Sequence, residues 1–343
     1  MSLGFAIIGA GNIAGVQIEA IKHIDEARVV VINNRTEATG RALAESCGAE
    51  WTGDTKEAVS RDDVDIVIVS TPSGAHVEPA VLAASAGKHL IVEKPIEITL
   101  SRIDQIIEAA RTHNVKLTCF FPSRFMQGVQ KAKEAINQGR LGKLVLADAF
   151  IKWYRSQEYY NVSWRGTWEF DGGGALMNQS IHSIDLLQWL AGPVESLYAK
   201  TATLTHDIQT EDTASALLSF KSGGMGVIQG ATSCWPGDPA KIELHGSKGT
   251  IVLEEGRITT WKLEDASEDE EDEMLNLEKK LGSGSADPMG ISYDKHRRQI
   301  LDMLSAIQNN HEPIVSGTEA RKAVEIILAI YESANAGQMV LLS

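Results

Sequence analysis

A glycine-rich turn near the N-terminus constrains the fold of this chain more than any other feature. GAGNIAG places Gly9, Gly11 and Ala14 between the apolar run FAIIG and an amphipathic segment. At this spacing the first glycine permits a tight turn, and the second lets the backbone approach a pyrophosphate. The small third residue lets a helix pack on the strand with its N-terminus toward the phosphates. We predict a dinucleotide site that includes Asn12 and Ile13; a plain tight turn is the alternative.

Short β-branched runs alternate with amphipathic segments over the first third of the chain. Runs such as RVVVINN and DIVIVSTP are separated by patterns of helical period. Fully apolar strands joined by helices are typical of a parallel sheet that is covered on both faces. We therefore expect residues 1–121 to form an NAD(P)-binding Rossmann domain, which is a doubly wound α/β fold.

The pattern changes after Pro122. Strands with alternating faces follow one another without helices between them, separated by turn signals such as KSGG and HGSKG. They are expected at about 194–204, 213–220, 225–232, 241–246, 250–254 and 257–263. We expect residues 122–343 to form a substrate-binding and oligomerisation α/β domain with a mostly antiparallel sheet. Its last helices are predicted near 293–310 and 318–336, and residues 282–288 read as a flexible connector.

Bulk composition excludes several classes of protein. Of 343 residues, 43% are hydrophobic and 23% are charged, which is ordinary for a globular protein. The sequence shows neither an apolar run of about 18 residues nor a signal-peptide pattern, so we expect no membrane span and no export. A formal charge of −14 without basic clusters gives no support for nucleic-acid binding. Three scattered cysteines without a C-x-x-C pair fit a reducing cytoplasm.

One segment carries much of the excess negative charge. Residues 264–273, EDASEDEEDE, include eight acidic side chains and no basic one. A run of like charges repels itself and is usually solvated. We expect a mobile loop here rather than a partner-binding tail.

The end of the second strand bears on the choice of dinucleotide. An acidic residue there binds the ribose 2′-hydroxyl of NAD, but this strand ends in VINNRT, with Asn34 and Arg35 and no carboxylate. The missing carboxylate removes a repulsion against a 2′-phosphate, and Arg35 adds an attraction. The pattern favours NADP over NAD; alternatively, Arg35 covers the adenine and both cofactors are used.

The stretch GGGALMNQSIHSID combines three glycines with an apolar helical pattern that carries Asn178, His182 and Asp185. At about 100° per residue these three positions fall on one face of a helix. An imidazole can exchange a proton near neutral pH, whereas an amide cannot. We expect the polar face to meet a substrate.

Four segments together resemble the glucose-fructose oxidoreductase / inositol dehydrogenase / rhizopine catabolism (Gfo/Idh/MocA) family. They are VEKP with Glu93-Lys94-Pro95, STPSGAH at 70–76, the glycine-rich helix at 172–192 and HGSKGTI at 245–251. The resemblance implies a Rossmann domain followed by an α/β domain with an open mixed sheet, whose free face often forms a homodimer or homotetramer. It also implies hydride transfer between a nicotinamide and a hydroxyl-bearing carbon of a sugar, sugar acid or cyclitol. A cis Lys94–Pro95 bond is a further expectation.

Lys94 and His182 are the predicted catalytic residues. Lys94 follows a parallel strand, where α/β sheets place ligands, and its ammonium can stabilise the reacting oxygen. His182 suits a general acid/base, with Lys94 in a relay; a buried structural histidine is the alternative. Glu93 is expected to position Lys94 or to contact the cofactor ribose. On the nicotinamide side we expect Thr71, Pro72 and His76, although His76 also suits a helix cap or a domain seam.

Asn178 departs from the family pattern, in which many members carry Asp at this position. Its amide can hold vicinal hydroxyls but cannot act as a base. Asp185 is expected either to bind on the substrate side or to make a packing bond. The aromatic and basic segment before the helix suits a sugar and, through its arginines, an anionic one; loop anchoring is the alternative. The predicted substrate residues are Arg124, Tyr154, Arg155, Tyr160, Trp164, Arg165, Asn178 and Asp185.

No spacing of His, Asp and Glu indicates a metal site. Two alternatives to a dehydrogenase remain on sequence grounds. One is a glycoside hydrolase that uses transient oxidation by a bound nicotinamide, and the other is a non-catalytic dinucleotide sensor. The presence of Lys94 and His182 argues against the sensor.

Overall fold

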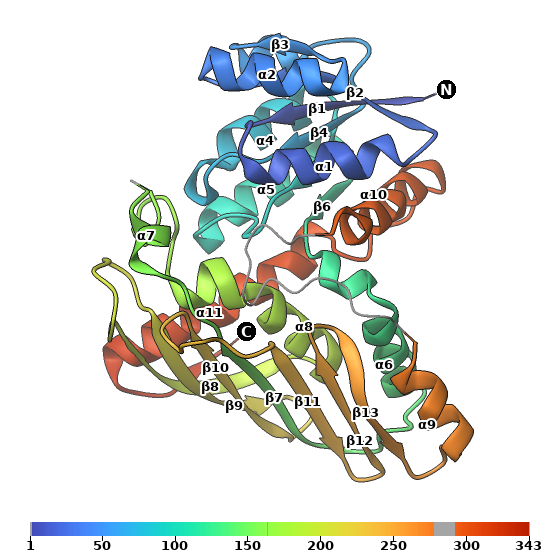
Figure 1. Ribbon diagram of the computed structural model, residues 1–343, viewed down its shortest axis with the longest axis vertical. Coiled ribbons are helices and arrows are strands. Elements are labelled where there is room, and N and C mark those ends of the chain that lie inside the picture. Colours follow the sequence, from blue (N-terminus) through green and yellow to red (C-terminus); the bar gives the residue numbers. More distant parts are fainter. Residues whose placement is uncertain (1, 163, 278–291, 343) are drawn as a thin grey trace. The chain divides into compact units, whose positions relative to one another are not determined.

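The computed structural model describes residues 2–162, 164–277 and 292–342 (Figure 1). They form two compact units, the first made of residues 1–122 with 292–321 and the second of residues 123–291 with 322–343. The expected division into 1–121 and 122–343 is therefore wrong for residues 292–321, which belong to the first unit. The predicted connector at 282–288 lies outside the described residues.

The first unit is built on a six-stranded parallel sheet in the order β3-β2-β1-β4-β5-β6. This is the Rossmann order, in which β1 lies between β2 and β4. Its strands are β1 (Leu3–Ile8), β2 (Ala27–Asn33), β3 (Glu50–Thr52), β4 (Ile66–Val69), β5 (His89–Val92) and β6 (Leu117–Cys119). Its helices are α1 (Asn12–Lys22), α2 (Glu37–Cys47), α3 (Thr55–Val59), α4 (Val77–Ser85), α5 (Leu100–Thr112) and α10 (Tyr293–Gln308), with the short turn η1 (Ser73–Ala75).

Helix α10 explains why residues 292–321 join the first unit. Its apolar residues Ile300, Met303 and Leu304 are buried in one cluster with Ile18 of α1 and Phe5 of β1. Helices α4 and α5 pack against each other elsewhere on the sheet. The apolar face of α10 thus completes the cover of the α1 side, although residues 120–292 separate it from the last strand of the sheet.

The second unit is built on an eight-stranded mixed sheet in the order β13-β12-β11-β7-β10-β9-β8-β14. Only β7 and β10 pair in parallel among these neighbours. The strands are β7 (Leu144–Lys152), β8 (Val194–Ala202), β9 (Thr213–Phe220), β10 (Met225–Ala231), β11 (Lys241–Gly246), β12 (Gly249–Glu254), β13 (Arg257–Leu263) and β14 (Val340–Leu341). The expected open, mostly antiparallel mixed sheet is confirmed.

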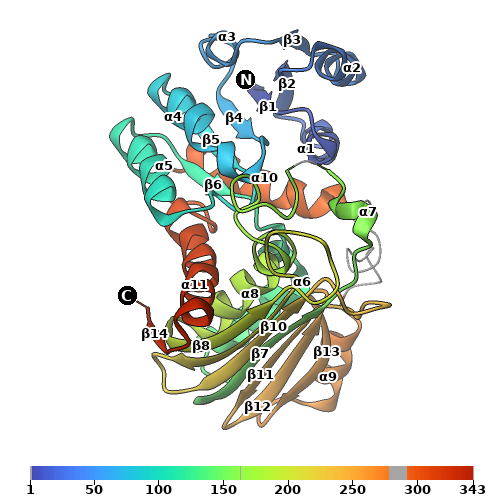
Figure 2. The ribbon, with the colours of Figure 1, turned by 90° about the vertical axis from the view of Figure 1, so that its left-hand side faces the viewer.

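Helices cover one face of this sheet (Figure 2). They are α6 (Gln127–Asn137), η3 (Ala175–Ser180), α8 (Ile181–Ala191) and the C-terminal part of α11 (Gly317–Ala336). The short η2 (Pro122–Phe125) precedes α6, and the short α7 (Gln157–Tyr160) lies in the loop between β7 and η3. Along β9, Ala214, Ala216 and Leu218 are buried whereas Leu217 is 58% exposed. Alternation with period two therefore leaves the opposite face open.

The acidic run is not the mobile loop that we expected from composition. It contains helix α9 (Glu268–Leu275), which Ser267 caps by accepting a hydrogen bond from the Glu270 backbone N–H. Acidic residues fill the first turn, where the helix dipole favours negative charge. Arg140 donates to both Glu270 and Asp265, so a distant cation offsets the local repulsion.

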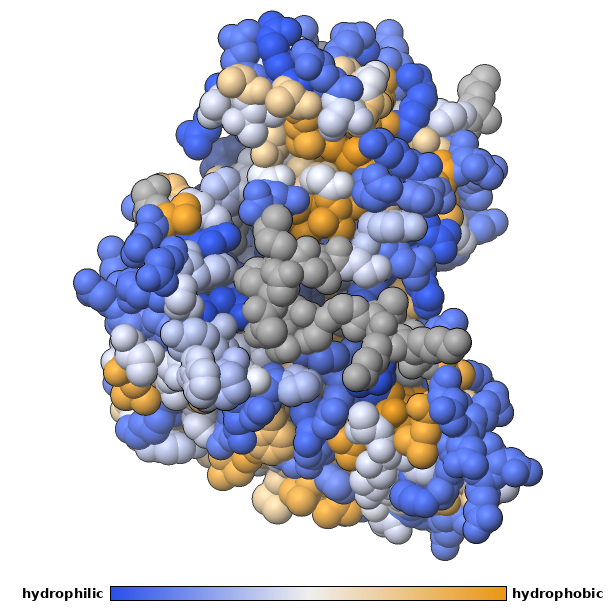
Figure 3. Space-filling model, in the orientation of Figure 1, coloured by the Kyte–Doolittle hydropathy of each residue, from blue (hydrophilic) through white to orange (hydrophobic). Residues whose placement is uncertain are grey.

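No helix among the described residues combines the length and apolar composition that a membrane span requires. In the view of Figure 3 the surface is mostly hydrophilic, and apolar side chains reach it in small groups, some of them along the lower edge beneath the strands of the large sheet.

Candidate functional site

The glycine turn of the first unit has the geometry of a phosphate cradle. Gly9 has φ +108°, and a Cβ there would lie 2.5 Å from the Ser70 carbonyl oxygen, so only glycine fits. A Cβ on Gly11 would meet nothing within 4 Å, so this backbone is open to a ligand. Ala14 is fully buried and lets α1 pack against the sheet. These residues fit the pyrophosphate of a dinucleotide at the α1 N-terminus.

Two further loops reach the same edge of the sheet. Thr71 and Pro72 follow β4, and Lys94 follows β5, whereas the glycine turn follows β1. Because β1, β4 and β5 are adjacent and parallel, their carboxyl ends lie together. This is the edge at which doubly wound sheets bind ligands.

Glu93 is held by contacts inside the first unit. Its carboxylate accepts hydrogen bonds from Gln17 Nε2 at 2.8 Å and from the Lys94 backbone N–H at 3.1 Å. Burial raises the pKa of Glu93. The Lys94–Pro95 bond is cis. These contacts favour positioning of the Lys94 loop over proton transfer by Glu93.

His76 does not occupy the position expected of a cofactor ligand. It is 1% exposed, its Nδ1 lies 3.0 Å from the Pro95 carbonyl oxygen, and its Nε2 lies 2.9 Å from that of Thr71. Both ring nitrogens therefore contact backbone, and the imidazole joins the loop after β4 to the loop after β5. We correct its predicted role from cofactor contact to support of these loops.

At the end of β2, Asn34 organises the turn with its own side chain. Its Oδ1 lies 3.4 Å from the Ala10 backbone nitrogen, and its Nδ2 donates to the Thr36 carbonyl at 2.9 Å. Arg35 is exposed and forms no ion pair within the part of the chain that the structure describes. Its guanidinium is therefore accessible to solutes.

In the second unit the predicted polar stripe is split by an irregular helix. Ala175–Ser180 form the π-helix η3, and α8 begins at Ile181. The turn of 100° per residue therefore does not hold between Asn178 and His182. Both side chains are partly exposed, whereas Asp185 is fully buried. π-helical turns are frequent at functional sites because they redirect side chains.

Asn178 is fixed by a network that the sequence did not reveal. Its Nδ2 donates to the Asp171 carboxylate, while its Oδ1 accepts from Gln179 Nε2 at 2.8 Å. Gln179 Nε2 also donates to the Tyr159 hydroxyl at 2.7 Å. A carboxylate thus lies directly beside the Asn178 amide.

Two arginines of the aromatic loop converge on Tyr159. The guanidinium carbon of Arg165 lies 4.0 Å from the centre of the Tyr159 ring, and that of Arg155 lies 5.7 Å from it. Arg155 is 4% exposed and donates from Nη2 to Gln179 Oε1 at 2.8 Å. Burial lowers the pKa of Arg155, and the charge of Arg165 lowers it further. This concentration of positive charge favours an anion.

Arg124 and Asp185 pair with each other. Arg124 donates from Nε and Nη2 to the two carboxylate oxygens at 2.8 and 2.6 Å, and both side chains are almost completely buried. The Arg124 guanidinium also lies 5.1 Å from the Trp189 ring centre. A bidentate buried pair of this kind supports packing, so we correct the predicted substrate contacts of Arg124 and Asp185 to structural roles.

The remaining predicted substrate residues lie in one loop but differ in exposure. Tyr160 is 7% exposed, and its hydroxyl lies 2.7 Å from Thr232 Oγ1, which matches loop anchoring. Tyr154 is 38% exposed. Trp164 lies beside Arg165, whose guanidinium carbon is 5.3 Å from its ring centre.

Sequence reasoning missed two side chains of this cluster, Asp171 and Gln179, and placed Tyr159 in the aromatic segment without assigning it to the substrate. Asp171 directly precedes the three glycines, and Gln179 directly follows Asn178. Their positions beside singled-out residues were the available signal. Their roles depend on contacts that cross 7 to 24 positions of sequence.

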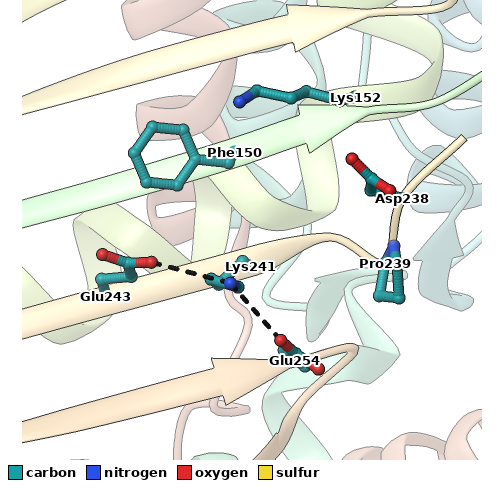
Figure 4. A pocket seen from close by; sticks show the side chains of 7 residues that line it. All are labelled: Phe150, Lys152, Asp238, Pro239, Lys241, Glu243 and Glu254. Carbon is teal, nitrogen blue, oxygen red and sulfur yellow. Dashed lines mark ion pairs between the residues drawn. The ribbon is translucent and has the colours of Figure 1, made fainter. Parts of the chain in front are cut away.

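A pocket of about 440 Å³ lies on the open face of the large sheet (Figure 4). Its floor includes Phe150 and Lys152 of β7 and Lys241 of β11, which pairs with Glu254 at 3.4 Å. None of the predicted site residues lines this pocket. We therefore do not assign the dinucleotide or the substrate to it.

The first unit has the sheet order and phosphate cradle of a dinucleotide-binding domain. The second unit contains a cluster of polar and cationic side chains. These features are typical of a nicotinamide-dependent oxidoreductase.

Comparison with known proteins identifies the family. The model for the oxidoreductase family with an NAD-binding Rossmann fold matches residues 3–121, and that for the GFO/IDH/MocA C-terminal domain matches residues 129–252. The chain belongs to the GFO/IDH/MocA family.

Similar proteins cover almost the whole chain. The WlbA dehydrogenase from Bordetella pertussis, whose crystal structure contains NADH and UDP-GlcNAcA, is 32% identical with a TM-score of 0.91, over 100% of this chain and 98% of that chain. Myo-inositol 2-dehydrogenase of Thermotoga maritima is 28% identical over 93% of this chain and 92% of that protein. Inositol 2-dehydrogenase of Rhizobium meliloti is 29% identical over 97% of each.

Proposed function

We propose that this chain is an NAD(P)-dependent dehydrogenase or reductase whose substrate is a sugar acid, free or linked to a nucleotide. The observation that carries the proposal is the convergence of Arg155 and Arg165 on Tyr159, next to the helix that bears Asn178. Guanidinium groups bind carboxylate and phosphate strongly through paired hydrogen bonds. Arg155 is buried, whereas Arg165 is partly exposed. The UDP-GlcNAcA in the 32% identical WlbA dehydrogenase is an anionic sugar of this kind.

The proposed chemistry divides between the two predicted catalytic residues. When bound, the nicotinamide supplies or accepts the hydride. The Lys94 ammonium donates a hydrogen bond to the reacting oxygen and stabilises its developing charge. His182 takes the hydroxyl proton during oxidation and returns it during reduction.

Asn178 and Asp171 act on orientation in this proposal. The Asp171 carboxylate accepts from the Asn178 amide, which fixes the direction in which the amide presents its donor and acceptor. Asn178 then holds a hydroxyl next to the reacting carbon but takes no proton. Proton transfer thus depends on Lys94 and His182.

We further propose that the chain accepts both dinucleotides and favours NADP. The support is the accessible Arg35 at the end of β2, where a carboxylate would repel a 2′-phosphate. The free thiols Cys47, Cys119 and Cys234 agree with our proposal of a cytoplasmic location.

The open face of the large sheet is our proposed homo-oligomer interface. Tyr198, Leu217 and Val227 lie in register across β8, β9 and β10, and Tyr198 and Leu217 are exposed. Apolar groups in a row on an open face favour association. Light scattering after gel filtration should show a dimer or tetramer, and Leu217→Lys should shift it toward monomer.

The substrate proposal is tested by following nicotinamide absorbance with a panel of sugars. We expect turnover of UDP-GlcNAcA to exceed that of neutral UDP-GlcNAc and of myo-inositol. Arg165→Gln should raise KM for the acid at least about 10-fold and leave KM for the neutral sugar unchanged. Arg257→Gln, on strand β13, is the matched control and should change neither value.

Other outcomes would redirect the assignment. Preference for myo-inositol over the acid would contradict the anionic substrate. Sugar release without net change of the dinucleotide would indicate the hydrolase. Tight dinucleotide binding with no turnover on the whole panel would indicate the sensor.

A further inference from the structure

The Glu211 side chain lies at the N-terminus of η3, which leads directly into α8 with the predicted general acid/base His182. No chemical role follows from its position in the sequence. It stands just before β9, in the segment QTEDT. Its Oε2 accepts from the Gly174 backbone N–H at 3.0 Å, and its Oε1 accepts from that of Leu176 at 2.8 Å. Its own carbonyl oxygen accepts from the Ala175 N–H at 2.9 Å.

These contacts satisfy three consecutive N–H groups at the N-terminus of η3. Such groups have no partner within the helix and carry the positive end of its dipole, so they attract an ionised carboxylate. The Glu211 carboxylate accepts a third hydrogen bond from α11, where the Tyr331 hydroxyl donates to Oε1 at 2.9 Å. The ionised carboxylate can accept the hydrogen bonds from Gly174, Leu176 and Tyr331 together. When the acid is protonated, one of its oxygens becomes a donor and then lies opposite another donor.

The glycines of the turn are explained by the same contacts. A Cβ on Gly174 would lie 1.8 Å from the Glu211 carbonyl oxygen, and one on Gly173 would lie 2.2 Å from the Tyr331 hydroxyl. The turn can therefore approach Glu211 and Tyr331 only without side chains. We call these contacts of Glu211 and Tyr331 with residues 173–176 the clamp. The position and direction of the helix that follows depend on the clamp.

We propose that Glu211 is a positioning residue whose ionisation holds the N-terminus of η3 and thereby sets the placement of Asn178 and His182 for catalysis. This inference rests on the proposed function for its catalytic consequence. Burial raises the pKa of Glu211 to about 7, and the hydrogen bonds from Leu176, Tyr331 and Gly174 counteract part of this rise. The clamp is accordingly complete above neutral pH and weakened below it.

Few other charged groups face Glu211. Within the described residues, Tyr331 is the titratable group that contacts it, and η3 contributes backbone amides. Asp212, the next residue, directs its carboxylate to the amides of Leu204 and Thr205 and to His206.

The first test is the pH profile of kcat/KM. Wild type should show a rising limb with a midpoint near pH 7. Tyr331→Phe removes a donor to the ionised carboxylate, so the limb should move upward by about one pH unit. Glu211→Gln should abolish this limb. Ser333→Ala is the matched control on the same helix as Tyr331. The Ser333 hydroxyl accepts from the Ala199 backbone N–H and donates to the Gln338 carbonyl, so its loss should leave the midpoint unchanged.

The second test needs no turnover and separates this inference from the proposed function. The backbone ¹⁵N chemical shifts of Gly174 and Leu176 should titrate near pH 7 in wild type and move upward in Tyr331→Phe. They should show no such step in Glu211→Gln. An unchanged limb in both variants, or amide shifts that ignore pH, would overturn the role of Glu211. Absence of turnover with a clear amide titration would instead count against the proposed function alone.

Discussion

Lys94 stands between two residues that restrict it. The preceding carboxylate of Glu93 is bound to Gln17 and to the Lys94 backbone. Pro95 has no N–H, and its carbonyl lies 3.0 Å from His76 Nδ1. The backbone on both sides of Lys94 is thus anchored to α1 and to the loop after β4, so a change of its side chain should leave the loop in place.

We expect Lys94→Ala to lower kcat at least about 1,000-fold, because the ammonium that stabilises the reacting oxygen is lost. Dinucleotide affinity should stay near the wild-type value. Steady-state kinetics and fluorescence titration measure the two quantities. Lys56→Ala, an exposed lysine of α3, is the control, and substantial activity in Lys94→Ala would contradict the assignment.

Arg35 should decide part of the cofactor preference. We expect Arg35→Ser to lower kcat/KM for NADP about 10-fold and to change that for NAD little, because only NADP carries the 2′-phosphate. The ratio of the two values in wild type and variant is the measurement. Equal losses with both dinucleotides would show that Arg35 contacts a shared part of the cofactor.

Glu211 should also leave a signature in stability. Its pKa of about 7 exceeds the ordinary value of 4.5, so the folded protein holds an extra proton between these two pH values. Burial costs the ionised carboxylate more free energy than its hydrogen bonds return. Its contribution to the free energy of unfolding should therefore fall as pH rises, by up to about 3 kcal/mol between pH 5 and 8. Denaturant unfolding of wild type and Glu211→Gln measures this difference. For the control Glu332→Gln, at an exposed residue of α11, the difference in free energy of unfolding from wild type should not change with pH. If the difference for Glu211→Gln also does not change with pH, the raised pKa of Glu211 is refuted.

Among the elements, α9 shows how a distant side chain overrides composition. Acidic repulsion within residues 264–273 predicts a mobile loop, but Arg140 and the Trp261 indole N–H both donate to Glu270. Arg140 follows α6 and Trp261 belongs to β13, so no pattern within residues 264–273 reveals these partners.

The strands β8 to β13, by contrast, each lie close to the range predicted from the sequence. Alternation with period two is a local property, so it can be recognised without knowledge of the fold.

Removal of the Arg140 side chain should loosen α9. We expect Arg140→Ala to raise amide hydrogen exchange in residues 265–275 and to lower global stability by about 1 kcal/mol, since a partly buried cation with two acidic partners is lost. Exchange measured by mass spectrometry tests the local effect. Lys131→Ala breaks an exposed ion pair with Glu134 on α6 and should change neither quantity measurably; equal exchange in both variants would contradict the anchor.

At the scale of the whole molecule, the chain leaves the Rossmann unit and returns to it. Helix α10 supplies Ile300, Met303 and Leu304 to the core around α1, and Gln299 donates to the Cys119 carbonyl at 2.6 Å. A boundary near residue 121 is visible in the sequence because the βα alternation stops there. The return is not, because an amphipathic helix does not specify which core its apolar face joins.

A fragment of residues 1–122 should therefore fold poorly by itself. Without α10 it exposes the apolar cluster around Phe5 and Ile18, so we expect dye binding typical of exposed apolar surface and weak near-ultraviolet circular dichroism. The same fragment joined by a flexible linker to residues 292–321 should unfold cooperatively. Cooperative unfolding of residues 1–122 alone would show that α10 is dispensable.

The sequence by itself determined the Rossmann turn, the succession of strands and helices, the class of oxidoreductase and two candidate catalytic residues. The turn and the succession of elements follow from spacing within a few residues, where backbone geometry and periodicity act directly. The class and the two catalytic residues rest mainly on the resemblance of four segments to a known family. Only the tertiary structure decided the partners of buried charge: Arg124 with Asp185 across 61 positions and Glu211 with Tyr331 across 120. A buried charge must be compensated by a partner, and the fold decides which side chain lies near enough to be that partner. Nothing in the sequence around either residue specifies it. The glycine-rich helix combines both: its glycines are visible in the sequence, while the carboxylate and the phenol that require them are not.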